Sequence, residues 1–543
     1  MRGLRRATAF SGPVASVCGA LMGFSGSAGA ATHDAPRVEV TTDSGVVHGK
    51  AGDRVLEWKG IPYAAPPLGE LRWALPQPPP PWAGVRDASN YRSACPQPSR
   101  YGLTDASDDE DCLYLNVTAP AAPAPVSRGR PVLVWIHGGA FIGGSSNLYP
   151  LDYLAREGDL VVVSINYRLG VFGFMPHPSF EATHNGGYAL EDQRAAFRWV
   201  KRNIAAFGGD PANVTIAGES AGAASVCMQL IAPDESRGLF EKAIVQSAAC
   251  AVRLHSVDEA EAIGRKVAHV VGCDEAATAL ACLRTKTVAE LLEAATTAAS
   301  GELMAFAPAV GSGSLPRQGA EALATGHFLR VPLINGGNRD EMRLYVGYDV
   351  AAGRTVTPEN YLDKLRATYG ESASAIAAEY PVTSYTSAPA ALGTVLSEYM
   401  PGGGLSNCLY LRGGRLASKY TPVFEYEFAD RGAPPVMPDP GFDLGAVHAA
   451  ELPYQFPHIS HTYKVDGPAL SPSADRLAAQ MLAYWSGFAH TGIPRPARLP
   501  RWRQFSRDAS VMRFDAAEVG LFDAAAAHHC AFWRALYPDI FGR

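Results

Sequence analysis

The sequence lacks the features of a membrane-spanning, nucleic-acid-binding or disordered protein. Its 543 residues carry a formal net charge of −6, with acidic and basic residues mixed along the chain and no run of basic residues interleaved with aromatic ones. The lack of a basic patch argues against nucleic acid as a partner. After the N-terminal segment there is no stretch of about 20 consecutive apolar residues, the length that a membrane-spanning helix needs. A hydrophobic content of 47% is that of an ordinary globular chain.

The N-terminus has the composition of an export signal. A charge-free, modestly apolar stretch over residues 7–30 ends in an A-x-A cleavage site at residues 28–30 and follows Arg2, Arg5 and Arg6. We interpret residues 1–30 as a secretory signal peptide, which predicts a secreted or periplasmic protein. The paired arginines leave a twin-arginine signal open beside the general one, and the alternative is a disordered alanine-rich tail.

The nine cysteines lack the spacing of a metal or redox site. None is in a CxxC motif, and no cluster of histidine and cysteine is present, so we expect no zinc site. Without Cys18 eight cysteines remain, and an even number behind a signal peptide indicates disulfides. Cys95 with Cys112, and Cys273 with Cys282, would close short local loops.

Continuous apolar runs alternate with helical segments over most of the chain. "PVLVWI", "LVVVSI", "NVTIAG", "KAIVQSA", "RVPLING" and "TPVFEYEF" are typical of strands buried on both faces of a parallel sheet. "LEDQRAAFRWVKRNIAAFG" has an apolar face at helical spacing and stops at Gly208-Gly209. The N-terminal "RVEVTTDSGVVHGK" and "VLEWKGIPYAAPP" indicate antiparallel strands. We therefore predict an α/β protein with a mostly parallel central sheet, antiparallel N-terminal strands and helices on both faces.

Two mainly helical stretches, residues 255–300 and 355–420, interrupt this alternation. Neither is bounded by a long flexible linker, and the sheet pattern resumes after each. We interpret them as helical insertions over the site of a single domain, residues 31–543. No internal repeat is visible.

"GESAGAASV", residues 218–226, contains a serine in G-x-S-x-G spacing. The strand "NVTIAG" precedes Ser220 and a helical pattern follows it. A sharp strand-to-helix turn strains the serine backbone, exposes its hydroxyl and admits only small neighbours. The alternative is a flexible turn into a closely packed helix. The context favours Ser220 as a nucleophile that attacks a carbonyl carbon.

Such a serine needs hydrogen-bond donors for the oxyanion that forms after attack. "WIHGGAF", residues 135–141, is a buried strand that ends in a glycine-rich loop upstream of the serine. The backbone N–H groups of Gly139 and Ala140 are candidate donors, and Ala221 at the start of the helix supplies a third. A plain tight turn is the alternative for this loop.

The serine also needs a base and an acid, in the chain order serine, acid, histidine. The acid should follow a strand, and "VPLINGGNRDE" offers both Asp340 and Glu341. His448 follows "TPVFEYEF" and is the candidate base. Without a family motif, other downstream histidines are alternative candidates for the base, namely His458, His461, His490, His528 and His529.

Together these motifs resemble those of the type-B carboxylesterase/cholinesterase family, which has the α/β-hydrolase fold. The similar segments are "GIPYAAPPLGELRW" (60–73), "EDCLYLNV" (110–117), "WIHGGAF", "NYRLGVFGF" (166–174), "FGGDPANVTIAGESAGAASV" (207–226) and "CAFW" (530–533). The resemblance runs from about residue 38 to 540. It implies a serine esterase that hydrolyses a small-molecule ester without cofactor or metal, as a monomer or homodimer. Ser220 would be the nucleophile, His448 the base and Glu341 the orienting acid.

The resemblance also implies structural roles for several side chains. It suggests the disulfides Cys95–Cys112, Cys273–Cys282 and Cys408–Cys530. Cys227 and Cys250 are then left over as candidates for free thiols, with Cys227 a small buried side chain rather than a reactive one. Two charge pairs, Arg72 with Glu110 and Arg168 with Asp192, would brace the scaffold.

The substrate is less well defined by the sequence. Glu219 either holds the turn by hydrogen bonds or places a negative charge near a substrate cation or His448. Phe306 and Tyr345 are candidates for lining the site, or belong to the core. The loop from Cys95 to Cys112 has no tryptophan, and Tyr101 is its only aromatic residue, so the platform for a choline cation is missing. A lipase, an amidase, a hydrolase of toxin or polymer esters and a non-catalytic binding domain of the same fold are the alternatives.

Overall fold

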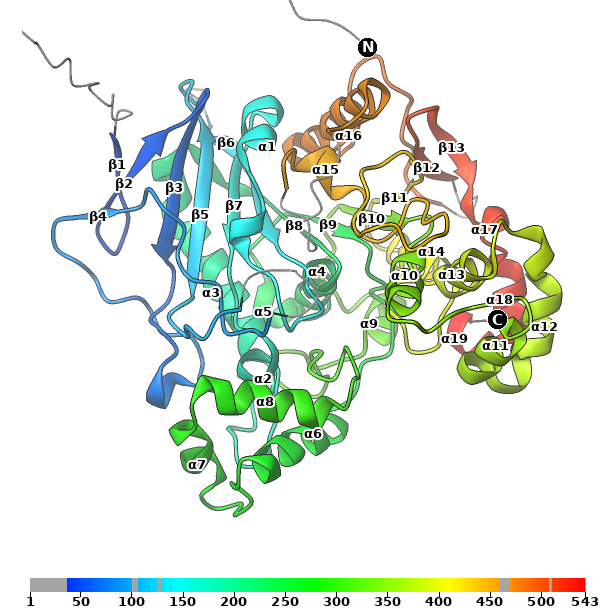
Figure 1. Ribbon diagram of the computed structural model, residues 1–543. Helices are drawn as coiled ribbons and strands as arrows, with labels where there is room; N and C mark the ends of the chain where they lie inside the picture. Colours follow the sequence, from blue (N-terminus) through cyan, green and yellow to red (C-terminus); the bar gives the residue numbers. More distant parts are fainter. Residues whose placement is uncertain (1–36, 100–105, 125–127, 460–468, 507–509, 543) are drawn as a thin grey trace, which may run out of the picture. The chain divides into compact units, whose positions relative to one another are not determined.

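A single mixed sheet extends from β1, which begins at Arg37, to β13, which ends at Asp523 (Figure 1). The computed structural model describes residues 37–99, 106–124, 128–459, 469–506 and 510–542. The predicted signal peptide, Tyr101 and His461 lie outside these residues. Within the described part the strand order is β1-β2-β3-β5-β7-β6-β8-β9-β10-β11-β12-β13, and β4 pairs with β2. The strands are β1 (Arg37–Thr41), β2 (Val46–Ala51), β3 (Val55–Pro62), β4 (Val85–Asp87), β5 (Tyr114–Pro120), β6 (Arg130–Ile136), β7 (Val161–Ile165), β8 (Gly209–Glu219), β9 (Lys242–Gln246), β10 (Leu333–Asn338), β11 (Val423–Phe428), β12 (Ser510–Phe514) and β13 (Val519–Asp523).

The pairing directions match the sequence patterns. From β7 to β12 every neighbouring pair is parallel, whereas β1, β2, β3 and β5 pair antiparallel in turn, as β5 does with β7. The predicted mostly parallel sheet with antiparallel N-terminal strands is therefore confirmed. The antiparallel hairpin partner β13 extends the sheet beyond the last predicted strand.

Helices cover both faces of the sheet. They are α1 (Asp152–Gly158), α2 (Gly170–Gly173), α3 (Tyr188–Asn203), α4 (Ala221–Ile231), α5 (Pro233–Ser236), α6 (Val257–Val270), α7 (Ala279–Thr285), α8 (Val288–Ala299), α9 (Gly319–Thr325), α10 (Arg343–Ala351), α11 (Tyr361–Tyr369), α12 (Ala373–Glu379), α13 (Ala388–Glu398), α14 (Asn407–Ala417), α15 (Leu452–Gln455), α16 (Pro472–Thr491), α17 (Ala524–Ala527), α18 (Cys530–Leu536) and α19 (Pro538–Phe541). Helices α6 to α8 and α11 to α14 occupy the two stretches interpreted as insertions.

The alternation of side chains along β6 separates two hydrophobic cores. Val132, Val134 and Ile136 point into a core that includes residues of α3, α4 and α14. Leu133 and Trp135 point the other way, into a core with residues of α1 and α16. Because successive side chains of a strand face opposite sides of the sheet, one fully apolar run serves both cores, and this explains why β6 shows no alternation in the sequence.

Four disulfides tie the described residues together. The structure pairs Cys95 with Cys112, Cys273 with Cys282 and Cys408 with Cys530, the three bonds suggested by the family resemblance. The expectation that Cys227 and Cys250 are free is wrong, because the two form a fourth bond. Cys227 lies on α4 and Cys250 follows β9, and packing of the helix against this strand brings their Cα atoms to 5.1 Å, within the range that a disulfide spans.

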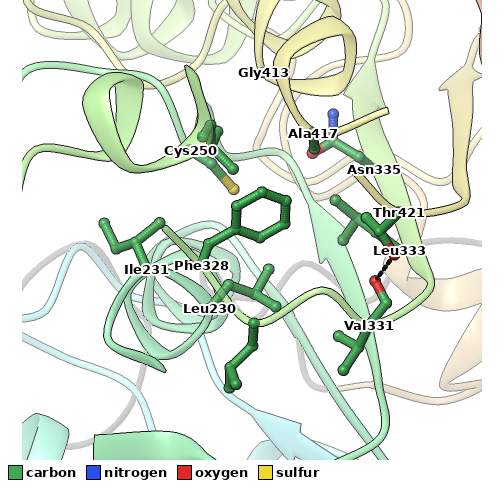
Figure 2. Close-up of a pocket in the computed structure, with 12 residues that line it drawn as sticks. Leu230, Ile231, Cys250, Phe328, Val331, Leu333, Asn335, Gly413, Ala417 and Thr421 are labelled. Carbon is green, nitrogen blue, oxygen red and sulfur yellow. Dashed lines mark hydrogen bonds between the residues drawn. The ribbon is translucent and has the colours of Figure 1, made fainter. Parts of the chain in front are cut away.

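The surroundings of this fourth bond are apolar. Figure 2 shows Cys250 near Phe328 and the α4 residues Leu230 and Ile231, around an internal cavity of about 10 Å³. The Thr421 hydroxyl donates to the carbonyl of Val331 at 2.8 Å in the same region. A cavity of this size holds at most about one water molecule, so the Cys227–Cys250 disulfide lies in a closely packed part of the core.

We expect peptide mapping of the unreduced chain to recover Cys227 and Cys250 as one cross-linked pair. Replacing both with alanine opens a loop with a sequence separation of 23 and should lower the free energy of unfolding by about 3 kcal/mol, measured by urea unfolding. The matched control is Cys273→Ala with Cys282→Ala, which opens a loop of separation 9 and should cost less. Alkylation of Cys227 or Cys250 without prior reduction would contradict the pairing.

Candidate active site

Ser220 lies in a strained turn between β8 and α4. Its backbone angles are φ 56° and ψ −124°, a region that non-glycine residues rarely adopt and that occurs chiefly at functional sites. The glycines on either side are required by close approach. A Cβ on Gly222 would lie 2.0 Å from the carbonyl oxygen of Ile136, and one on Gly218 would lie 2.5 Å from the backbone of Gly222. The two glycines of the motif thus let α4 begin directly against β6.

His448 and Glu341 meet Ser220 at the carboxyl ends of the strands. Glu341 follows β10, and His448 lies in the segment between β11 and α15. His448 Nε2 is 2.9 Å from Ser220 Oγ, and its Nδ1 is 2.7 Å from Glu341 Oε2. Glu341 is fully buried and His448 is 5% exposed. This chain of contacts suits an imidazole that takes a proton from a serine while a carboxylate orients it.

The second oxygen of Glu341 is also held. Its Oε1 accepts hydrogen bonds from the Asn338 backbone N–H at 2.9 Å and from the Tyr410 hydroxyl at 3.0 Å. Burial and the neighbouring Glu341 carboxylate keep the pKa of Tyr410 well above its usual range, so the phenol stays a donor. Sequence reasoning missed Tyr410, because it lies on α14, 69 residues after Glu341, and no motif links the two.

Glu219 places a further carboxylate beside His448. Its Oε1 is 3.2 Å from His448 Nε2, has no hydrogen-bond partner among the described residues, and is nearly fully buried. Burial raises the pKa of Glu219 to about 8. Burial lowers the pKa of His448, but Glu219 and Glu341 outweigh it and raise that pKa to about 9. The structure thus places the Glu219 carboxyl group beside His448, and within the described residues no hydrogen bond to its side chain holds the turn.

Glu451 extends this acidic surrounding. It is fully buried, accepts a hydrogen bond from the Asn338 side-chain amide at 2.6 Å and another from Gln246 at 3.3 Å. Burial raises the pKa of Glu451. Glu451 was not predicted, because it lies in the turn just before α15, three residues after His448, and belongs to no motif.

The glycine-rich loop after β6 faces the same space. Gly139, Ala140 and Phe141 have φ values of 113°, 53° and 62°, so the chain turns with three successive left-handed residues. The N–H groups of Gly139, Ala140 and Ala221 donate no hydrogen bond within the part of the chain that the structure describes. Free N–H groups beside a nucleophile are what an oxyanion requires.

Ser220 opens into a cavity of about 340 Å³. Its wall includes Leu148, Leu303, Tyr345, Tyr348 and Ile459, and the Asp349–Arg354 ion pair also lines it. Tyr345 lies over His448, with 5.9 Å between the ring centroids. Phe306 does not line this cavity. It is 3% exposed and borders a smaller apolar cavity beside it, which shares Leu303.

The other candidate acids and bases lie elsewhere. Asp340 pairs with Arg343 and accepts from the Ala446 backbone N–H. His458 is exposed, His490 contacts the Gly158 carbonyl, and His528 and His529 pair with glutamates. The two scaffold pairs are present, with Arg72 on Glu110 and Arg168 on Asp192, all of them buried.

The described residues contain no group of three or more histidine, cysteine, aspartate or glutamate side chains that could hold a metal ion. Within the same ranges, no helix is both long enough and apolar enough to span a bilayer.

The chain is similar to known esterases over nearly all its length. The model of the carboxylesterase family matches residues 35–533. The para-nitrobenzyl esterase of Bacillus subtilis is 35% identical over 87% of this chain and 94% of its own, and the fumonisin B1 esterase of Sphingopyxis macrogoltabida is 35% identical over 90% and 88%. Human cocaine esterase is 33% identical over 91% and 89%. A solved structure of a PNB esterase aligns with a TM-score of 0.76 and 33% identity, covering 90% of this chain and 98% of that one.

The sheet, its helical layers and these structural matches define an α/β-hydrolase fold. The chain belongs to the carboxylesterase family and is a carboxylic ester hydrolase.

We expect Glu219→Gln to lower the pKa of His448. Removing the carboxylate takes away one of the negative charges that stabilise the imidazolium, so the neutral form of His448 persists to lower pH. The acid limb of kcat/KM for an aryl ester should shift to lower pH by the same amount, while the imidazole proton resonance reports the pKa directly. The control is Glu70→Gln, which changes an exposed glutamate in a segment well before Glu219 in the sequence. An unchanged pKa of His448 would show that Glu219 exerts no charge effect on it.

Proposed function

We propose that Ser220, His448 and Glu341 form a catalytic triad that hydrolyses carboxylic esters through an acyl-enzyme. His448 Nε2 takes the proton of Ser220 as Oγ attacks the ester carbonyl, and Glu341 holds the resulting imidazolium. The imidazolium then gives that proton to the leaving alcohol. Water, activated by His448, releases the acid in the second half-reaction. The observation that carries this proposal is the continuous set of contacts from Ser220 Oγ through His448 to Glu341.

The N–H groups of Gly139, Ala140 and Ala221 are the proposed oxyanion donors. Their positions on the loop after β6 and at the start of α4 support the proposal, as does their lack of other acceptors in the described part of the chain. Ala140 serves as well as a glycine, because only its backbone N–H is needed and its φ of 53° is already the left-handed value that the turn requires. Losing one such donor costs on the order of 10²–10³ in rate.

The proposed substrate is an uncharged ester with an aromatic or branched apolar part. Leucine, isoleucine and tyrosine side chains line the cavity at Ser220, and the charged Asp349 and Arg354 neutralise each other. The names of the relatives refer to several unlike esters, so they do not favour one of them. A panel of aryl esters, with an anilide and a triglyceride included, separates an esterase from an amidase or a lipase.

We further propose that the chain is exported and that residues 1–30 are removed. The four disulfides support this, since such bonds persist in oxidising compartments.

We expect Ser220→Ala to lower kcat for p-nitrophenyl acetate by at least about a thousandfold, because the other triad members cannot act without the nucleophile. The matched control is Ser247→Ala. Ser247 is also buried, has a φ of 61° and directly follows the neighbouring strand β9, but its hydroxyl makes no hydrogen bond among the described residues. Kcat should stay within about tenfold of the parent in this control.

The outcome also decides between an enzyme and a binding domain. Activity that survives in Ser220→Ala would overturn the assignment of the nucleophile. Absence of ester turnover in the parent chain, with ester binding retained, would favour a non-catalytic domain of the same fold.

A further inference from the structure

A second cavity, of about 260 Å³, opens beside the turn that carries Glu341. Arg339, Asp340 and Arg343 contribute from this turn, and Glu398, Glu427 and His528 contribute from α13, β11 and the segment after α17. None of its lining residues lines the cavity at Ser220. The walls are mostly polar side chains, so the space is suited to a polar ligand rather than to an acyl chain.

A buried histidine holds two of the carboxylates. His528 Nδ1 is 2.9 Å from Glu398 Oε2, and its Nε2 contacts Glu427. All three side chains are at least nine-tenths buried. Burial lowers the pKa of His528, but the two carboxylates outweigh it and raise that pKa to about 10. Arg513 adds a second cation to Glu427 at 3.2 Å.

The third carboxylate of the wall is also paired. Asp340 lies 3.2 Å from Arg343 Nε and accepts a hydrogen bond from the Ala446 backbone N–H. Arg343 is nearly fully buried, and its Nε has no well-aligned hydrogen-bond partner in the described ranges. The three carboxylates thus pair with Arg343, Arg513 and the imidazolium of His528. Arg431 lies 3.6 Å from Asp340 as well and is itself paired with Asp443.

Arg339 is the cation that remains. It is exposed at the cavity, and its guanidinium has no ion pair or hydrogen bond with any residue that the structure describes. Arg339 acts electrostatically on Glu427 without an ion pair to it, and that carboxylate is already paired with His528 and Arg513, so the guanidinium of Arg339 is available to an anionic ligand. A guanidinium binds a carboxylate through two parallel hydrogen bonds.

Two phenol groups in the wall indicate which kind of anion suits the cavity. The hydroxyl of Tyr385 makes no hydrogen bond within the described residues, and the Tyr380 hydroxyl oxygen accepts from the Trp533 indole at 2.8 Å. Both phenols are therefore able to donate. Each carboxylate of the wall is already paired with a cation. The single unpaired guanidinium of Arg339 therefore matches the one negative charge of a monocarboxylate better than the two charges of phosphate.

We propose that this cavity binds a small hydroxylated monocarboxylate, with its carboxylate on Arg339 and its hydroxyl group on Tyr380 or Tyr385. The inference does not depend on the assignment of Ser220.

Calorimetric titration of the full chain with 4-hydroxybenzoate tests the proposal. We expect one saturable site, and at least about tenfold weaker binding of the neutral 4-hydroxybenzamide and of inorganic phosphate, since charge-assisted hydrogen bonds carry the affinity. Arg339→Gln should weaken binding by at least about tenfold, and Arg339→Lys should weaken it less, because the charge is kept but the two-pronged contact is lost. Arg339 is exposed, and equal melting temperatures verify that the variants fold.

Arg354→Gln is the matched control, because it removes an exposed arginine from the cavity at Ser220 instead. Loss of binding in Arg354→Gln with retention in Arg339→Gln would place the carboxylate in the cavity at Ser220 and overturn the proposal. No saturation up to about 10 mM, which is weaker than specific binding requires, would overturn it as well. Equal binding of the amide or of phosphate would refute the class of ligand.

Discussion

The parallel pairing of β8 to β11 is the constraint on which the site depends. Gly218 is opposite Val245, Gln246 is opposite Gly336, and Asn338 is opposite Phe428. These registers place the carboxyl ends of the strands at one edge, where ligands of open α/β sheets bind. Segments 228 residues apart in the chain therefore meet as Ser220 and His448. The strained turn at Ser220 is maintained because β8 on one side and α4 on the other are both packed against β6, and this packing fixes the backbone between them.

The charges around His448 determine the pKa of its imidazole. A buried charge is costly unless it is paired and hydrogen-bonded, and His448 has carboxylates within 3.2 Å at both nitrogens. The Glu341 carboxylate at Nδ1 orients the ring, whereas Glu219 lies at Nε2, the nitrogen that faces Ser220. A proton on His448 favours the ionised form of Glu219, and a proton on Glu219 weakens the attraction that raises the pKa of His448. The two groups are thus linked in their titration.

Local patterns made the framework predictable. The apolar runs predicted β6 to β11, and the glycines around Ser220 and the loop at Gly139 predicted the strand-to-helix turn and its companion loop. Contacts between distant segments were not predictable where no motif of the family marks them. The Cys227–Cys250 bond, the Tyr410 hydrogen bond to Glu341 and the position of Phe306 outside the cavity at Ser220 all depend on how insertions and helices pack against the sheet. β12 and β13 were missed because they are short and only partly buried.

The central claim is that Ser220 carries the acyl group during turnover. Rapid acid quenching during hydrolysis of a slowly deacylating aryl ester, followed by mass spectrometry of the digested chain, tests it most directly. We expect one acyl group per chain, on the peptide that contains Ser220, appearing with the burst of released phenol and decaying with the rate constant kcat once the ester is exhausted. Turnover without any acylated peptide, or acylation at another residue, would contradict it.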